Sequence, residues 1–124
     1  MLGKILVIDD NEFFIEMLSC FLDTLGYEVD VATSARLGLR QAACFQPDLI
    51  VVDIIMPDMD GYDFLRELNQ KGNSAKVIAV SGGGWVDKYE YLKAAELLGA
   101  DCAFSKPFNS LDDFGSKVKE LMAA

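Results

Sequence analysis

The sequence predicts an α/β fold, a doubly wound five-stranded parallel sheet of strand order 2-1-3-4-5 lying between two layers of helices. Short apolar runs alternate five times with longer amphipathic stretches along the 124 residues. Three of these runs are continuous, as strands buried on both faces of a parallel sheet require. Right-handed crossovers between five βα units place helices on both faces of such a sheet. We expect one domain, residues 1–124, because this length suits a single core.

The five apolar runs are the expected strands. The first, third and fourth runs are unbroken, so we place them inside the sheet. The second run, Val29–Val31, alternates between apolar and charged residues, which suits an edge strand with one face in water. The expected strands are Ile5–Ile8, Val29–Val31, Leu49–Val52, Val77–Val80 and Cys102–Phe104.

The stretches between the strands are expected to be helices, and the first carries its apolar residues on one face at helical spacing. Gly26, Gly72 and Gly99 each follow one stretch and suit the position just beyond a helix. Pro47 ends another helix because it cannot continue it. Ser110 opens the last helix with a partial capping box. The expected helices are Asn11–Leu25, Ser34–Gln46, Tyr62–Gln70, Val86–Leu98 and Ser110–Ala124.

The composition limits the classes of partner. Lys and Arg number 11 and Asp and Glu 20, so the net charge is −9, which argues against binding nucleic acid or an anionic membrane surface. No apolar run has the length of a membrane span, and the segment Met1–Asp10 does not resemble a signal peptide. We therefore expect a cytoplasmic protein, and we expect its three cysteines, which lack metal-type spacing, to be reduced and buried.

Histidine is absent from the chain. This absence excludes Ser-His-Asp and Cys-His catalysis, metal ligation by histidine, and any role of this chain as a histidine phosphodonor. The chemistry of the protein must therefore use carboxylates, hydroxyls, lysine and the backbone.

Three carboxylates fall where an open parallel sheet binds its ligands. In the predicted order the winding reverses between the first and third strands, beyond their carboxyl ends. The first strand ends in Asp9-Asp10 and the third runs into Asp53. Like charges so close are costly unless a cation joins them, and Mg²⁺ prefers such hard oxygen ligands. The alternatives are that Asp9 and Asp10 cap the first helix and that Asp53 is an ordinary acid at a strand end.

The fourth and fifth strands end in two further polar groups. Ser81 precedes Gly82–Gly84, so its hydroxyl lies beside backbone that can approach a phosphate closely. Lys106, before Pro107, can reach across the site to an anion. Taken singly, an ordinary loop and an ordinary turn explain these residues as well. Taken together, the four strand ends would bind Mg²⁺ and a phosphoryl group, with Asp53 as candidate nucleophile.

These motifs resemble the receiver domain of bacterial two-component response regulators, the CheY-like family with a flavodoxin-like fold. The resemblance covers essentially the whole chain, and both the order and the spacing of the motifs match. It leads us to expect a stand-alone, single-domain receiver. The matching segments are Ile8–Asn11, Asp53–Gly61, Val80–Gly82, Gly99–Asp101 and Lys106–Phe108.

The resemblance implies that Asp53 accepts a phosphoryl group from a phosphohistidine on a sensor histidine kinase or a phosphotransfer protein. It also implies a site for Mg²⁺. Asp10 would bind the ion directly and Asp9 through water. Asp53 and the backbone carbonyl of Ile55 would complete the protein ligands. The chain would catalyse its own phosphorylation and dephosphorylation, and it would not be an enzyme with a metabolic product.

By the same resemblance, Ser81 and Lys106 each bind a phosphoryl oxygen, and the Lys106–Pro107 peptide bond is expected to be cis. The sequence departs from the family three residues before the lysine, where relatives usually carry an aromatic residue and this chain has Ala103. Phe104 is adjacent, but strand alternation directs it to the opposite face of the sheet. The usual aromatic switch is therefore expected to be absent.

The resemblance further implies a downstream protein target. Phosphorylation would alter binding at the face made by Val86–Leu98, Cys102–Phe104 and the helix that Ser110 opens. We expect no binding to nucleic acid or membrane, and a monomer or weak homodimer.

Three other functions are compatible with an α/β domain of this size. A degenerate receiver would act as a phosphorylation-independent interaction scaffold. Such a scaffold does not need all five polar residues at the strand ends, which are Asp9, Asp10, Asp53, Ser81 and Lys106. A flavin-binding protein needs a phosphate-cradling loop after the first strand, where Asp9 and Asp10 repel an anion. A phosphohydrolase with an aspartyl nucleophile needs a second Asp two residues after Asp53, where Ile55 stands.

Overall fold

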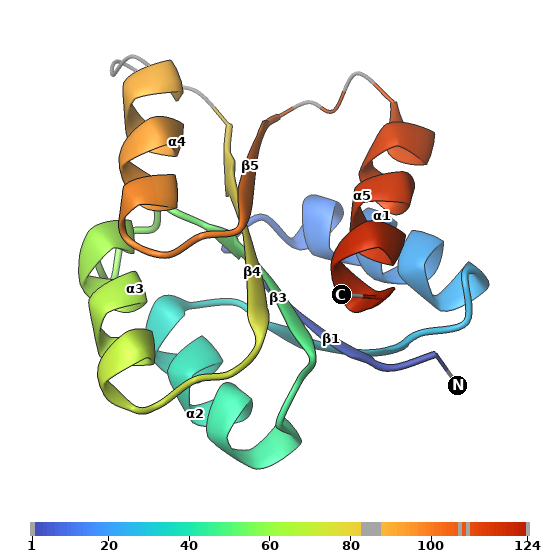
Figure 1. The fold of residues 1–124 in the computed structure, drawn as a ribbon, viewed down its shortest axis with the longest axis horizontal. Coiled ribbons are helices and arrows are strands. Elements are labelled where there is room, and N and C mark those ends of the chain that lie inside the picture. Colours follow the sequence, from blue (N-terminus) through green and yellow to red (C-terminus); the bar gives the residue numbers. More distant parts are fainter. Residues whose placement is uncertain (1, 83–87, 107, 109, 124) are drawn as a thin grey trace.

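The computed structural model describes residues 2–82, 88–106, 108 and 110–123. Within these ranges five parallel strands form one sheet in the order β2-β1-β3-β4-β5, with helices on both faces (Figure 1). The predicted fold class and strand order are therefore confirmed. The elements are β1 Lys4–Ile8, α1 Glu12–Thr24, β2 Glu28–Ala32, α2 Ala35–Phe45, β3 Leu49–Asp53, α3 Gly61–Gln70, β4 Lys76–Ser81, α4 Lys88–Leu97, β5 Cys102–Ser105 and α5 Leu111–Ala123.

Two apolar cores hold the sheet between its helix layers. Successive side chains of a strand point to opposite faces, so β1 directs Leu6 and Ile8 into one core and Ile5 and Val7 into the other. Helices α2, α3 and α4 cover the first core, and α1 and α5 cover the second (Figure 1). Strands β1, β3 and β4 are almost wholly buried, whereas β2 is largely half-buried, as its alternating sequence predicts for an edge.

Helix α1 is capped by Asn11. The Asn11 side chain accepts a hydrogen bond from the Phe14 N–H at 3.1 Å, which satisfies one of the free donors at the start of the helix. The alternative in which Asp9 and Asp10 serve only as the caps of this helix is therefore wrong. Asp9 instead accepts hydrogen bonds from the Asn11 N–H and from Lys106, and Asp10 is exposed at the carboxyl end of β1.

The predicted helix ends are largely confirmed. Gly26, Gly72 and Gly99 follow α1, α3 and α4 with positive φ values of 99°, 75° and 114°, a conformation that glycine adopts without steric cost. Helix α2 is followed by its cap residue Gln46, which is left-handed at φ 52° and directly precedes Pro47. The predicted start of the fourth helix, at 86–87, and the predicted last residue of the fifth, at 124, lie outside the described residues.

The burial of the cysteines corrects one expectation. Cys102 is buried in β5, but Cys20 and Cys44 are exposed. The physical reason is that Cys20 and Cys44 lie on the solvent sides of α1 and α2, where helical spacing turns every third or fourth residue outward. Burial raises the pKa of the Cys102 thiol to about 11. None of the helices in the described ranges has the length and apolar character needed to cross a bilayer.

The loop between β3 and α3 is closed tightly over the end of β3. The Gly61 N–H donates to the Ile54 carbonyl at 3.1 Å, and a Cβ on Gly61 would lie 2.4 Å from that oxygen. Only glycine fits there without a backbone shift. Ile55 forms an antiparallel bridge with Asp60 in the same loop. This closure fixes the backbone that follows Asp53.

Candidate functional site

Three carboxylates meet at the carboxyl ends of β1 and β3, where the winding of the sheet reverses. One oxygen from each of Asp9, Asp10 and Asp53 lies within 4.8 Å of the others. Asp9 is 0 % exposed and Asp53 5 % exposed, while Asp10 is open to solvent. The structure thus brings together the three acids that the sequence singled out. Because Asp53 is buried, the alternative of an ordinary solvated acid at a strand end is wrong.

Lys106, which follows β5, neutralises part of this charge. Its Nζ lies 2.6 Å from Asp9 Oδ2 and 3.2 Å from Asp53 Oδ2. The Lys106 N–H donates to the Ser81 carbonyl at 2.8 Å, which holds the end of β5 against the end of β4. A Cβ on Gly82 would lie 3.4 Å from the Lys106 Cε, so the first glycine of the loop borders the lysine stem. Gly83, Gly84 and Pro107 lie outside the described residues.

The charges of the site shift two pKa values. Burial raises the pKa of the Asp53 carboxyl, and the Asp9 charge adds to this, against the opposing effects of the Ile55 N–H and Lys106. Burial lowers the pKa of Lys106, but its hydrogen bond to Asp9 and the Asp53 and Asp9 charges outweigh burial and leave the pKa above its ordinary value. The site therefore favours a charged lysine and holds its Asp53 carboxylate at a cost in free energy.

Asp53 is held by the backbone as well. Its Oδ1 accepts a hydrogen bond from the Ile55 N–H at 2.8 Å, while Oδ2 faces Lys106. The Ile55 side chain itself is 40 % exposed, so the residue contributes to the site through its backbone. An acid oriented from both sides and largely removed from water is arranged as a nucleophile or a metal ligand.

Ser81 carries an unpaired hydroxyl at the same edge. It is the last residue of β4 and is 0 % exposed, and its Oγ has no hydrogen-bond partner among the described residues. The register pairs Asp53 with Val80, so Ser81 stands one position further along the neighbouring strand. A buried hydroxyl without a partner costs about 1–3 kcal/mol. A buried hydroxyl of this kind can donate a hydrogen bond to a ligand that binds at the site.

The donor set fits a divalent cation. Three carboxylates supply hard oxygen atoms, and the exposure of Asp10 leaves room for the water ligands that Mg²⁺ retains. Lys106 and Ser81 supply a positive charge and a hydroxyl donor, which suit an anionic group beside the cation. The arrangement can therefore hold a cation and a phosphoryl group together.

Two contacts at or near the site are not predicted by the sequence. Phe14, which the helical pattern marks only as a core residue, has its ring centroid 4.2 Å from Lys106 Nζ. Asp58 in the β3–α3 loop accepts hydrogen bonds from the N–H groups of Ala35 and Arg36 at the start of α2. The sequence carries no signal for either contact, because both join segments distant along the chain.

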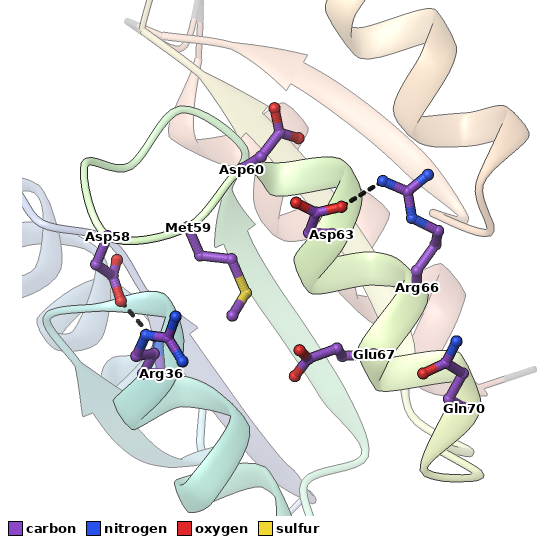
Figure 2. Close-up of a pocket in the computed structure, with 8 residues that line it drawn as sticks. All are labelled: Arg36, Asp58, Met59, Asp60, Asp63, Arg66, Glu67 and Gln70. Carbon is purple, nitrogen blue, oxygen red and sulfur yellow. Dashed lines mark hydrogen bonds and ion pairs between the residues drawn. The ribbon is translucent and has the colours of Figure 1, made fainter.

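A separate groove lies between α2 and α3 and does not include the acidic cluster. Its volume is about 470 Å³, and Figure 2 shows Asp58 bonded to the Arg36 N–H and Asp63 paired with Arg66 at its rim. Its lining includes four acidic and two basic side chains. The lining residues are Arg36, Asp58, Met59, Asp60, Asp63, Arg66, Glu67 and Gln70.

Comparisons with known proteins agree with this geometry. The chain is 31 % identical to the alkaline phosphatase synthesis transcriptional regulatory protein PhoP of Bacillus subtilis, over 96 % of this chain and 48 % of that protein. It is 36 % identical to the chemotaxis protein CheY of Treponema pallidum, over 98 % of this chain and 81 % of that protein. The chain thus spans about half the length of the first of these relatives.

A solved structure and a family model also match this chain, and both are of response regulator receiver domains. The structure of a CheY-like response regulator receiver domain protein from Methanospirillum hungatei matches with a TM-score of 0.86 and 29 % identity, over 99 % of this chain and 95 % of that one. The model of the response regulator receiver domain matches residues 5–118. The chain therefore belongs to the response regulator receiver domain family.

Proposed function

We propose that this chain is a phosphoacceptor switch of a two-component system, in which Asp53 accepts a phosphoryl group from a phosphohistidine on a sensor histidine kinase or a phosphotransfer protein. The observation that carries the proposal is the Asp53 carboxylate. It is 5 % exposed, it is oriented by the Ile55 N–H at 2.8 Å, and it faces Lys106 Nζ at 3.2 Å. This environment removes the carboxylate from water and aims it, as attack on phosphorus requires.

Each side chain has a role in the transfer. A bond forms between a carboxylate oxygen of Asp53 and phosphorus, while the bond from phosphorus to the donor imidazole breaks and leaves its electron pair on nitrogen. Lys106 moves toward a phosphoryl oxygen and neutralises part of its charge. Ser81 donates its O–H to a second oxygen, which satisfies a hydroxyl that is otherwise unpaired. Transfer of this kind is catalysed by positioning and charge neutralisation.

Magnesium is the proposed cofactor. Asp10 and Asp53 would hold it directly, Asp9 through water, and the Ile55 carbonyl would complete the protein ligands. When bound, Mg²⁺ supplies positive charge that offsets repulsion between the three acids and the incoming phosphoryl oxygens. The support for this assignment is the cluster of three carboxylates within 4.8 Å.

The proposed partners follow from membership of the family and from charge. The phosphodonor is a histidine kinase or phosphotransfer protein, and the proposed downstream target is a protein that binds the α4–β5–α5 face. A net charge of −9 supports the proposal that neither nucleic acid nor membrane is bound. We further propose a cytoplasmic location, a monomeric or weakly dimeric state, and no enzymatic product beyond the chain's own phosphorylation and dephosphorylation.

Covalent phosphorylation is the direct test. The protein is incubated with acetyl phosphate, with and without Mg²⁺, and its intact mass is compared with that of Asp53→Asn. Asp60→Asn, an exposed acid in the same loop, serves as the matched control. We expect a Mg²⁺-dependent phosphoryl adduct in the parent and the control and none in Asp53→Asn. Absence of an adduct when Mg²⁺ binds would instead favour a phosphorylation-independent scaffold.

A further inference from the structure

Four phenylalanine rings form one cluster beside the site, on the side of the sheet that α1 and α5 cover. Phe108 stacks on Phe114 of α5 with ring centroids 4.5 Å apart and planes 12° apart. Phe104 of β5 meets both of these rings edge-on, at 5.6 and 5.2 Å. Phe14 of α1 meets Phe108 edge-on at 5.6 Å. Phe14 therefore contacts the segment after β5 through Phe108, and Phe108 in turn packs on β5 and α5.

The cluster reaches the acidic site through Phe14. Lys106 Nζ lies over its ring, 4.2 Å from the centroid, well inside the distance at which a cation is attracted to a ring face. The same Nζ bonds Asp9 and Asp53. Phe14 is 9 % exposed and the Lys106 side chain 13 % exposed. The attraction acts with little water present, where it is strongest.

Phe14 is joined to the site on its backbone side too. Asp9 Oδ1 accepts from the Asn11 N–H at 2.9 Å, and the Asn11 side chain accepts from the Phe14 N–H at 3.1 Å. The Phe14 ring contacts Lys106, and Lys106 returns to Asp9 Oδ2 at 2.6 Å. These four contacts form a closed chain of interactions that begins and ends at the Asp9 carboxylate. The start of α1 and the lysine are thus held relative to each other.

We propose that Phe14 is a positioning residue for Lys106, holding its ammonium group over the gap between Asp9 and Asp53. A lysine stem has several rotatable bonds, and fixing it costs conformational entropy. A ring face attracts the ammonium without a fixed direction, so Lys106 can move from Asp9 toward a phosphoryl oxygen on Asp53 and stay in contact with Phe14. This inference deepens the proposed function and rests on it for its catalytic consequence.

Three variants distinguish the positioning of Lys106 by the Phe14 ring from a general contribution of Phe14 to core packing. Phe14→Met keeps an apolar side chain of similar size but removes the ring face. Phe14→Tyr keeps the ring. Phe13→Met is the matched control, because Phe13 is the neighbouring residue and is 86 % exposed. Thermal unfolding of each variant reports any loss of folding separately.

The first measurement is NMR of the Lys106 ε-methylene protons in the unphosphorylated protein. We expect an upfield ring-current shift and an NOE to the Phe14 ring in the parent, Phe14→Tyr and Phe13→Met. The upfield shift is expected to disappear in Phe14→Met. Absence of the shift and the NOE from the parent would overturn the proposal, and this result does not depend on the folding of any variant or on phosphorylation.

The second measurement is the rate of phosphorylation by acetyl phosphate at saturating Mg²⁺, separated into the limiting rate constant and the apparent KM. We expect Phe14→Met to lower the limiting rate constant roughly three- to thirtyfold, and Phe14→Tyr to restore it. Equal losses in both Phe14 variants, or none in either, would overturn the positioning role. A parent protein that shows the NMR signature but forms no adduct at Asp53 would contradict the proposed function instead.

Discussion

At the scale of single residues, the site combines buried acids with one shared cation. Lys106 bonds Asp9 and Asp53 at once, yet burial still leaves the pKa of Asp53 above its ordinary value. The lysine therefore compensates the burial of the Asp53 carboxylate incompletely. Groups of this kind are found at functional sites, where a cost in stability is retained for reactivity.

Replacement of Asp53 by asparagine is predicted to raise the free energy of unfolding at pH 7 in the presence of EDTA. Because the pKa of Asp53 is raised in the folded protein, its ionised form favours unfolding. This destabilisation by the ionised carboxylate is absent below the ordinary carboxyl pKa of 3.8, and it grows as the pH rises through the pKa of Asp53 in the folded protein. Denaturant unfolding of the parent and Asp53→Asn from pH 4 to 7 checks this. A parent more stable than the variant at pH 7 would contradict the prediction.

At the scale of secondary-structure elements, Asp58 ties the β3–α3 loop to the start of α2. Its two carboxylate oxygens accept from the N–H groups of Ala35 and Arg36 at 3.1 and 3.0 Å, and Figure 2 shows the second bond at the rim of the groove. Ser34 accepts from the Leu37 N–H at 3.2 Å. The free donors at the start of a helix are thus satisfied in part by a loop 22 residues away in sequence.

Removal of this cap is predicted to destabilise the protein. Asp58→Ala leaves two N–H groups of α2 without their acceptor and is expected to lower the free energy of unfolding by about 1 kcal/mol. Asp23→Ala, at an exposed acid on α1, is the control and is expected to change it by less than about 0.5 kcal/mol. Urea unfolding of both variants measures the difference. Equal stability of the two would show that the Asp58 bonds contribute nothing in solution.

At the scale of the whole molecule, the 124 residues carry a net charge of −9, and three of the carboxylates lie together at the sheet edge. A cation that binds there binds the folded chain alone, because the unfolded chain does not bring β1 and β3 together. Binding of this kind stabilises the fold by mass action.

Magnesium is therefore predicted to stabilise the protein by about 1.4 kcal/mol when its free concentration is ten times its dissociation constant. Thermal unfolding with Mg²⁺, with EDTA, and with NaCl at equal ionic strength separates specific binding from screening. Asp10→Asn is expected to reduce the gain and leave the EDTA curve nearly unchanged. A gain of the same size from NaCl would contradict a specific site.

Much of this protein is determined by sequence alone. The unbroken apolar runs of β1, β3 and β4 require burial on both faces, and the alternating run of β2 suits an edge. Together with the chain length, this pattern agrees with the known order of a five-stranded doubly wound sheet. The same pattern places Asp9, Asp10 and Asp53 at one edge of the sheet, because parallel strands end together. The aspartates, the serine and the lysine were thus predictable as a set, and the opposite sides that Ala103 and Phe104 take in β5 followed from strand alternation.

Only the tertiary structure decided how these groups contact one another. It made Asn11, not Asp9 or Asp10, the cap of α1. It also placed the Phe14 ring under Lys106, 92 residues later in the chain, and Asp58 at the start of α2. Periodicity tells which face of an element is buried, but not which atom of another element lies opposite. Those contacts depend on the packing of side chains from distant segments, which no local pattern encodes.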